Sequence, residues 1–296
     1  MNGDWSKKII KTEYPKIVDL YKNGLTQLEI ANQYKVTPSA ICFILRGLGI
    51  KGRSNRGCRD YNVDRRYFSE IDSHNKAQIL GFISADGNIM RSCLRIELQE
   101  RDTYYLEHIK TELQYNGPMD FSTKECKGNG IWRKYSRFRV TSQDIVDDLD
   151  KLGVIPKKSL VLQFPTETQV NKKFLSSFVC GYFEGDGCVS INRQAHTSSI
   201  NICGTYIFLS KLQSILKNDL DINSTINQQK NCKIHCLWIY GNHQILKFLD
   251  WIYSKIDFVM KRKYDLYKAI QTWYTKNGDN YIKIRKKHVF KNKDKV

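Results

Sequence analysis

Apolar and polar positions follow two different periods along this chain, and the changes of period predict its organisation. In the first fifty residues apolar side chains recur at helical spacing in three short runs. From residue 74 onward, helical runs are separated by pairs of stretches in which every second residue is apolar, as in half-buried strands. The order helix, strand, strand, helix, strand, strand, helix occurs over 74–165 and again over 174–275, joined by a connector at 166–173. We therefore expect an α+β fold of two tandem repeats with pseudo-twofold symmetry, preceded by a small all-α domain.

The first fifty residues have the pattern of a helix-turn-helix. Thr26-Gln27-Leu28-Glu29 is a capping box that begins a second helix, and Thr37 followed by Pro38 begins a third. The segment resembles the DNA-binding helix-turn-helix of recombinases and many phage regulators, which implies that the third helix enters a major groove. The positions expected to face that groove are Ser39, Ala40, Phe43 and Arg46. The alternative is a plain three-helix bundle that binds protein.

Two further segments are basic and carry no strong structural pattern. Residues 51–73 are predicted to be a linker, because Gly, Ser and Asn interrupt any regular element at its start. Residues 276–296 are predicted to be a basic C-terminal tail, and seven Lys and Arg against one Asp in the last sixteen positions suit contact with phosphate.

Two segments one hundred residues apart share an unusual pattern. Ile79–Gly87 and Val179–Gly187 are apolar helical stretches that end in Asp-Gly. Small residues four apart lie on one face of each predicted helix, which favours close packing of one helix on the other; these residues are Gly81 and Ala85, and Gly181 and Gly185. The glycine after each Asp is typical of a left-handed C-terminal cap, so both helices are expected to end there.

This packing predicts a metal site. It places Asp86 and Asp186 side by side at the negative ends of two helices, where the helix dipole and mutual repulsion both disfavour a carboxylate. Divalent cations would neutralise such a pair.

Charge and composition limit the classes of binding partner and the cellular locations to be expected. The chain has 48 Lys and Arg against 30 Asp and Glu, a net charge of +18, so a polyanion is expected and nucleic acid is the first choice. The sequence has no apolar segment long enough to predict a membrane span, and its first residues lack the apolar core of a secretion signal. The nine cysteines are odd in number and scattered, so they are expected to be free thiols, and Cys232 with Cys236 is not expected to bind zinc. We expect a protein that is cytoplasmic and not secreted, in a phage, bacterial or other mobile-element context, with an organelle left open.

The two segments are a pair of LAGLIDADG motifs, and residues 74–275 resemble a two-repeat, monomeric LAGLIDADG homing endonuclease. The resemblance implies αββαββα repeats whose two four-stranded sheets form a saddle over the DNA major groove. It also implies that Asp86 and Asp186, with Gly87 and Gly187, bind Mg²⁺, for which Mn²⁺ can substitute. Each repeat closes on a basic cluster, and the match assigns catalytic lysines to Lys158 and Lys263, with Lys157 and Lys261 as the neighbours most easily confused with them.

Recognition of the target sequence would fall to the sheets. Alternation along the strands leaves polar side chains that can pair with base edges: Arg95, Glu97, Gln99, Arg137 and Arg139 in the first repeat, and Ser190, Asn192, Gln194, Asn227 and Gln229 in the second. A solvated sheet face is the alternative for each of them.

Three functions remain open on this evidence. The first is a site-specific homing endonuclease that cuts both strands of a long duplex DNA target as a monomer. The second is a DNA-binding regulator on the same scaffold that does not cleave. Such regulators lose the two catalytic acids and carry their helix-turn-helix after the scaffold, whereas this chain keeps Asp86 and Asp186 and has the helix-turn-helix first. The third is an RNA maturase, which an added helix-turn-helix argues against, because the A-form major groove does not admit a recognition helix.

Overall fold

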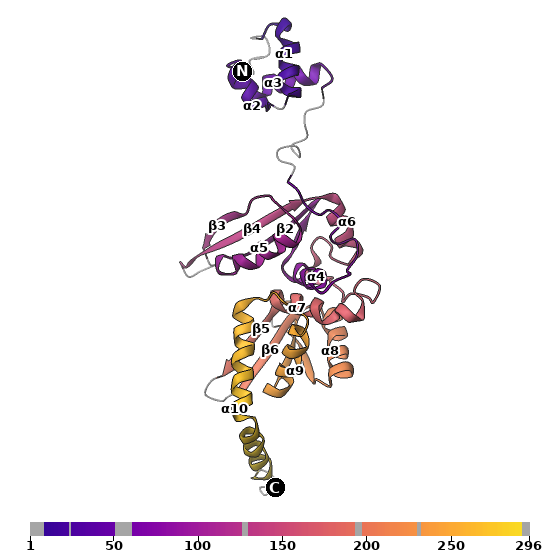
Figure 1. Ribbon diagram of the computed structural model, residues 1–296, viewed down its shortest axis with the longest axis vertical. Helices are drawn as coiled ribbons and strands as arrows, with labels where there is room; N and C mark the ends of the chain where they lie inside the picture. Colours follow the sequence, from indigo (N-terminus) through magenta and orange to yellow (C-terminus); the bar gives the residue numbers. More distant parts are fainter. Residues whose placement is uncertain are drawn as a thin grey trace. The chain divides into compact units, whose positions relative to one another are not determined.

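The computed structural model describes residues 9–23, 25–50, 61–125, 130–192, 197–229 and 232–291, with side chains described up to residue 276. The chain divides into two compact units, Met1–Tyr61 and Asn62–Val296, each with its own core (Figure 1). In the described part of the chain no helix is both long and apolar enough to cross a membrane.

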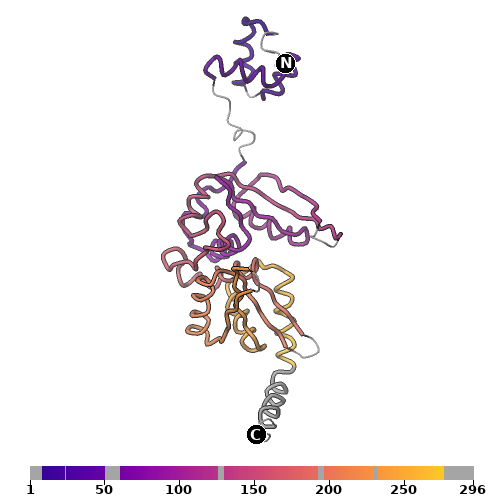
Figure 2. Tube along the Cα trace, turned by 180° about the vertical axis from the view of Figure 1, so that it is seen from behind, coloured from indigo at the N-terminus to yellow at the C-terminus, as the bar shows by residue number. Residues whose placement is uncertain are grey.

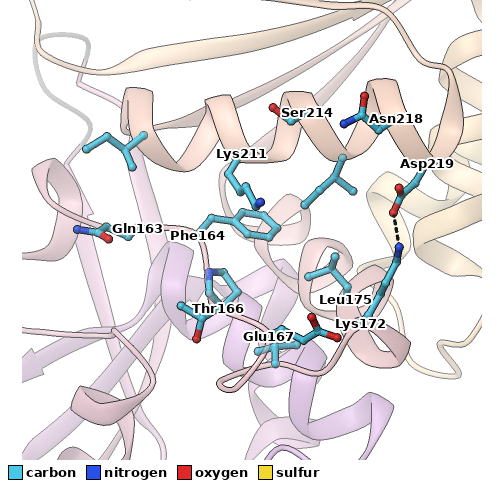
Figure 3. Close-up of a pocket in the computed structure, with 14 residues that line it drawn as sticks. Gln163, Phe164, Thr166, Glu167, Lys172, Leu175, Lys211, Ser214, Asn218 and Asp219 are labelled. Atoms are coloured by element: carbon cyan, nitrogen blue, oxygen red, sulfur yellow. Dashed lines mark ion pairs between the residues drawn. The ribbon is translucent and has the colours of Figure 1, made fainter.

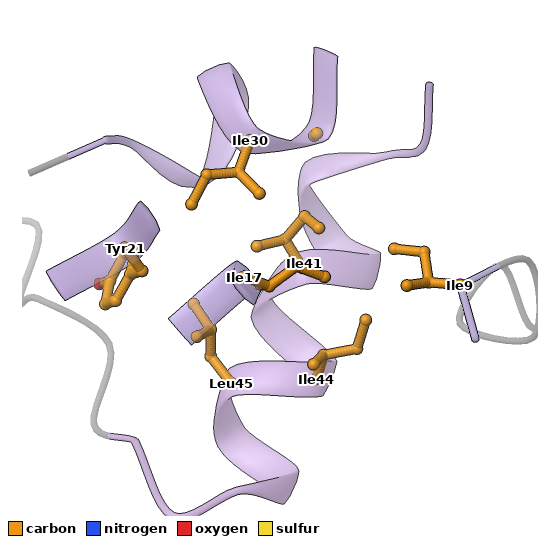
Figure 4. Close-up of a cluster of buried hydrophobic side chains, with 8 residues drawn as sticks. Ile9, Ile17, Tyr21, Ile30, Ile41, Ile44 and Leu45 are labelled. Carbon is orange, nitrogen blue, oxygen red and sulfur yellow. The ribbon is translucent and has the colours of Figure 1, made fainter. Parts of the chain in front are cut away.

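The first unit contains three α-helices. They are α1 (Tyr14–Lys22), α2 (Gln27–Gln33) and α3 (Pro38–Gly47), preceded by a 3-10 turn at Lys11–Glu13. The predicted capping box is present, since the Thr26 hydroxyl accepts a hydrogen bond from the backbone N–H of Glu29 and the Glu29 carboxylate accepts one from that of Thr26. Thr37 caps α3 and Pro38 is its first residue, as predicted. Figure 4 shows the core between the helices, built from Ile9, Ile17, Tyr21, Ile30, Ala31, Ile41, Ile44 and Leu45.

The second unit contains the two repeats in the predicted order. The first comprises α4 (His74–Asp86), β1 (Asn88–Met90), β2 (Cys93–Gln99), α5 (Thr103–Glu112), β3 (Asp120–Glu125), β4 (Trp132–Thr141) and α6 (Gln143–Lys151). The second comprises α7 (Leu175–Asp186), β5 (Gly187–Asn192), β6 (Thr197–Gly204), α8 (Tyr206–Leu220), β7 (Ser224–Gln228), β8 (His235–Tyr240) and α9 (Asn242–Tyr253). The final helix, α10 (Lys261–Lys291), continues into the region predicted as a basic tail. The predicted α+β fold of tandem αββαββα repeats is confirmed.

Each repeat has one antiparallel sheet with the same topology. The strand orders are β1-β2-β4-β3 and β5-β6-β8-β7. Apolar residues such as Leu94 and Ile96 in β2, and Ile200 and Ile202 in β6, alternate toward the helices and are fully buried. Figure 2 traces the backbone of both repeats from the other side. The strand residues that alternate with these buried ones point to the opposite face and are less buried, as Arg95 in β2 and Asn201 in β6 are, and we call this the open face of each sheet.

Candidate active site

The motif helices α4 and α7 form the centre of the second unit and touch along their backbones. A Cβ atom on Gly81 would lie 2.0 Å from the carbonyl oxygen of Phe178, and one on Gly181 would lie 1.8 Å from that of Gln78. These separations are far inside van der Waals contact, so any side chain at either position would push the helices apart. A Cβ atom on Gly185 would likewise lie 2.4 Å from the Cβ of Ala85. All four small residues of the two motifs therefore lie at this helix contact.

The glycines that follow the two aspartates adopt a conformation different from the one expected. Both helices end at the aspartate as predicted, but the left-handed cap is wrong, since Gly87 has φ −70° and Gly187 has φ −91°, both in extended backbone. Glycine is needed here for space. A Cβ on Gly87 would lie 2.5 Å from the carbonyl oxygen of Ile83, and one on Gly187 would lie 2.2 Å from the ring of Phe183.

Lys158 and Lys263 reach the ends of the two motif helices. The Lys158 ammonium donates hydrogen bonds to the carbonyl oxygens of Ala85, at 3.2 Å, and Gly87. The Lys263 ammonium donates to those of Phe183, at 2.6 Å, and Glu184, at 2.8 Å. Each ammonium thus satisfies carbonyls at a helix C-terminus and offsets the negative end of the helix dipole.

Burial separates these two lysines from their neighbours in sequence. Lys158 is 7 % exposed and Lys263 is 2 % exposed, whereas Lys157 and Lys261 are exposed. Lys157 adopts a left-handed conformation with φ 59°, which begins the 3-10 turn Lys158–Leu160. In each basic cluster, only the buried lysine donates hydrogen bonds to the C-terminus of the motif helix that ends in an aspartate.

Two carboxylates and two ammoniums share this partly buried site. Asp186 is half-buried, and this desolvation, with repulsion from Asp86, raises its pKa to about 6. Asp86 is the more exposed of the two, but desolvation by the surrounding protein raises its pKa as well. Burial, with repulsion from Arg262, lowers the pKa of Lys263 to about 8 against the attraction of Glu184 and Asp86. Burial also lowers the pKa of Lys158, against the attraction of Asp186 and Asp86. Desolvation therefore outweighs attraction within the cluster, and the aspartates favour any further positive charge that approaches them.

The donor atoms suit a divalent metal that is shared with a substrate. Among the described residues, no group of three or more His, Cys, Asp and Glu side chains could hold a metal ion. Two carboxylates nevertheless fit Mg²⁺, which typically takes one or two protein carboxylates and completes its shell with waters and phosphate oxygens. The Gly87 carbonyl, also expected as a ligand, already accepts a hydrogen bond from Lys158.

A buried carboxylate in the second motif was not predicted to organise the site. Glu184 is fully buried and accepts hydrogen bonds from the Tyr105 hydroxyl, from the Gln78 side chain at 3.0 Å and from the backbone N–H of Met260 at 2.7 Å. Its counterpart Ser84 instead donates to the carbonyl of Leu80, one turn away in the same helix. Glu184 thereby fixes the segment that leads to Lys263. An acid inside an otherwise apolar helix was the sequence signal for this role.

The third helix of the first unit presents most, but not all, of the expected groove-facing residues. Ser39, Phe43 and Arg46 are exposed, and Phe43 is 67 % exposed. Ala40 is buried, so its predicted groove-facing position is wrong. It lies one turn before Ile44, on the helix stripe that faces the core.

The polar candidates of the first sheet share its open face and pair with one another. Arg95 lies opposite Arg139, and Glu97 lies opposite Arg137 in the strand register. Glu97 forms ion pairs with Arg95 at 2.8 Å, with Arg137 at 3.4 Å and with Lys124. Gln99 is half-buried on the same face. The structure therefore places all five candidates of this repeat on one surface.

The candidates of the second sheet are more scattered. Ser190, Asn192 and Asn227 are exposed in strands of the second sheet. Gln229 follows β7, and its side-chain amide donates to the thiol sulfur of Cys236 at 3.0 Å. Gln194 lies outside the described residues.

A separate cavity of about 650 Å³ opens between the inter-repeat connector and α8 (Figure 3). Phe164, Lys211 and the ion pair of Lys172 with Asp219, at 3.2 Å, line it. None of the two aspartates and two lysines at the motif ends borders this cavity, so it lies apart from the candidate site.

Comparison with known proteins agrees with this architecture. Residues 173–253 match the family model described as a LAGLIDADG-like domain. The homing endonuclease I-WcaI, in a structure bound to its DNA recognition sequence, aligns with 65 % of this chain and 87 % of its own length, at 15 % identity and a TM-score of 0.50.

Two further solved structures align with the chain at lower scores. The LAGLIDADG homing endonuclease I-LtrWI, bound to target DNA, aligns with 72 % of this chain and 92 % of its own, at 12 % identity and a TM-score of 0.44. The N-terminal LAGLIDADG domain of DUF199/WhiA aligns with 66 % of this chain and 86 % of its own, at 17 % identity and a TM-score of 0.38. No curated protein matches the sequence. The second unit of this chain therefore has the two-repeat fold of the LAGLIDADG homing endonucleases, and its second repeat is a LAGLIDADG-like domain.

Proposed function

We propose that this chain is a site-specific homing endonuclease that makes a metal-dependent double-strand cut in a long duplex DNA target. The observation that carries the proposal is the site at the motif ends. Two aspartates lie there at the C-termini of two contacting helices, each helix end bonded by a buried lysine. One acid per repeat suits one scissile phosphate per strand.

The roles of the residues follow from their charges. Asp86 and Asp186 would hold the Mg²⁺ or Mn²⁺ that supplies an activated water and neutralises charge at the phosphate. Lys158 and Lys263 donate through Nζ to backbone carbonyls at the two helix ends, and as cations they would stabilise negative charge that develops on a phosphate brought to the site. Both ammoniums are held in place by backbone carbonyls, so little reorganisation is needed when a phosphate arrives.

The remaining parts of the chain would supply affinity for duplex DNA. The net charge of +18 suits a polyanion, and the exposed side chains of Phe43 and Arg46 on α3 suit contact with a groove. Both motifs lie in one chain, so we expect it to act as a monomer.

A cleavage selection tests the proposal. The purified chain with Mg²⁺ would be incubated with a randomised duplex library, beside an Asp86→Asn/Asp186→Asn double variant. The proposal requires that the wild type cuts both strands at one site and that the variant binds this site without cutting. Tight binding without cutting in Mg²⁺ and in Mn²⁺ would instead indicate a non-cleaving regulator. Preference for structured RNA over duplex DNA would indicate a maturase.

A further inference from the structure

The open faces of the two sheets differ completely in charge. Strand register places five basic and two acidic side chains on the open face of the first sheet: Arg95, Lys124, Arg133, Arg137, Arg139, Glu97 and Asp120. The open face of the second sheet has no charged side chain among its described strand residues, which are Cys188, Ser190, Asn192, Thr197, Ser199, Asn201, Cys203, Thr225, Asn227, Cys236, Trp238 and Tyr240. Two repeats of the same fold therefore present different chemistry to whatever lies on them.

The charged face suits guanine. Arg139 pairs with Asp120 at 3.0 Å and Arg137 pairs with Glu97 at 3.4 Å, so the acids hold the guanidinium groups in defined positions on the sheet. A positioned guanidinium can donate two hydrogen bonds to O6 and N7 of guanine in the major groove, and a carboxylate can accept from the amino group of cytosine. This face can therefore distinguish G·C pairs.

The uncharged face carries an aromatic pair instead. The rings of Trp238 and Tyr240 are stacked with centroids 5.8 Å apart and planes 3° from parallel. Tyr240 is 53 % exposed, although an aromatic ring of this size gains most by burial. Trp238 lies between Asn201 of β6 and Thr225 of β7 in the register, near the middle of the sheet. The pair is thus an apolar platform on an otherwise polar, uncharged surface.

We propose that the second repeat reads an A·T-rich half-site, with Trp238 and Tyr240 contacting thymine methyl groups in the major groove. The inference rests on the proposed function, because it takes duplex DNA to lie on the open sheet faces. Thymine alone presents a methyl group in that groove, and an asparagine amide such as that of Asn201 can pair with adenine N6 and N7. The first repeat, with its arginines, reads the half-site that contains the guanines. The target is therefore asymmetric in base composition as well as in sequence.

Replacement of thymine by deoxyuridine tests this directly, because it removes the methyl group and leaves the pairing edge intact. A duplex site would first be selected with the full-length wild-type chain in Ca²⁺. Thymine would then be replaced by deoxyuridine in one half at a time, and affinity measured by titration of labelled duplex. We expect about a fourfold loss of affinity for each contacted thymine in one half only, which corresponds to ~0.8 kcal/mol for a buried methyl-sized group.

Variants assign the effect to the aromatic pair. In Trp238→Ala and in Tyr240→Ala the ratio of affinities for the thymine and deoxyuridine duplexes should approach one. Because each variant is compared with itself on two duplexes, partial loss of folded protein cancels. The matched control is Trp132→Ala, which removes a 65 % exposed tryptophan on the opposite face of the first sheet and should keep the wild-type ratio.

Three outcomes would overturn the inference. The first is that deoxyuridine has no effect in either half, and the second is that its effect persists in both aromatic variants. In either of these cases the proposed endonuclease function still stands. The third is that the chain binds no duplex at all, in which case the proposed function falls together with the inference.

Discussion

Gly81 and Gly181 are reciprocal contacts across the pseudo-twofold axis of the second unit. Gly81 faces the carbonyl oxygen of Phe178 in α7, and Gly181 faces that of Gln78 in α4, so closely that a Cβ atom on either glycine would lie 2.0 or 1.8 Å from the oxygen. Each helix therefore supplies the gap into which the backbone of the other fits. The distance between Asp86 and Asp186 is fixed by this contact, because each aspartate ends one of the two helices.

An alanine at either glycine should separate the helices. We expect Gly81→Ala and Gly181→Ala each to lower the free energy of unfolding by ~2–3 kcal/mol, since the added methyl group meets rigid backbone. Thermal unfolding followed by circular dichroism measures the change. Gly47→Ala is the control, because a Cβ there has nothing within 4 Å, and it should be neutral or slightly stabilising. Equal stability of Gly181→Ala and the wild type would contradict the helix contact.

The sequence was sufficient to predict this architecture because its signals are local. Alternation of apolar residues defined the strands, and small residues four apart identified the contacting helix faces. The errors arose where one residue type has two physical uses. Glycine after Asp86 permits a left-handed turn but also close packing, and the structure uses the second. Ala40 is small enough for either side of α3, and the tertiary contact placed it inside.

The details of the site depend on contacts between residues far apart in the sequence. Lys158 and Lys157 are adjacent and equally basic, and only the fold decides which one is buried at the end of α4. The partners of Glu184 lie in α4, α5 and the segment before α10, so no local pattern could identify them.

The hydrogen bonds of Glu184 should contribute more to stability than those of its counterpart in the first motif. Three donors meet its two carboxylate oxygens, and a glutamine in its place would direct an N–H group at one of those donors. We expect Glu184→Gln to lower the free energy of unfolding by ~2 kcal/mol. In the matched change Ser84→Ala only a bond within α4 is lost, so the cost should stay below ~1 kcal/mol. Chemical denaturation gives both values, and equal costs would contradict this role.

The aspartates of the site should cost stability when no metal is present. Burial disfavours the charged form of Asp186 and raises its pKa to about 6, and Asp86 adds repulsion. We therefore expect Asp186→Asn to unfold at or above the wild-type temperature in a chelator, while it loses cleavage. The control is Asp221→Asn, a surface carboxylate paired with Lys217 at 2.8 Å, which should change stability little. A clear drop in unfolding temperature for Asp186→Asn would show that attraction to the lysines dominates.

The two units should be separable. The hydrophobic core of the first unit is built from its own helices, and the chain divides at Tyr61. Deletion of residues 1–61 should leave the unfolding temperature of the two-repeat unit unchanged. Its affinity for duplex DNA should fall and depend less steeply on salt, because phosphate contacts are lost. Arg46→Ala in the full chain should reproduce part of that loss, and a truncated chain that fails to fold would contradict the independence of the units.

Thiol labelling can show which sheet face meets DNA. Cys188 and Cys203 both lie on the open face of the second sheet. Cys188 is exposed, whereas Cys203 is partly buried. Burial beside the Cys236 thiol raises the pKa of Cys203 to about 12. Since the thiolate is the reactive form, N-ethylmaleimide at pH 7.5 should modify Cys188 well before Cys203. The fully buried Cys180 is the internal reference and should stay unmodified in the folded protein.

Addition of a bound duplex should slow labelling of Cys188 at least about tenfold, as expected for a group covered by a ligand. Labelling of Cys188 at an unchanged rate in the complex would place the duplex on another surface of the molecule.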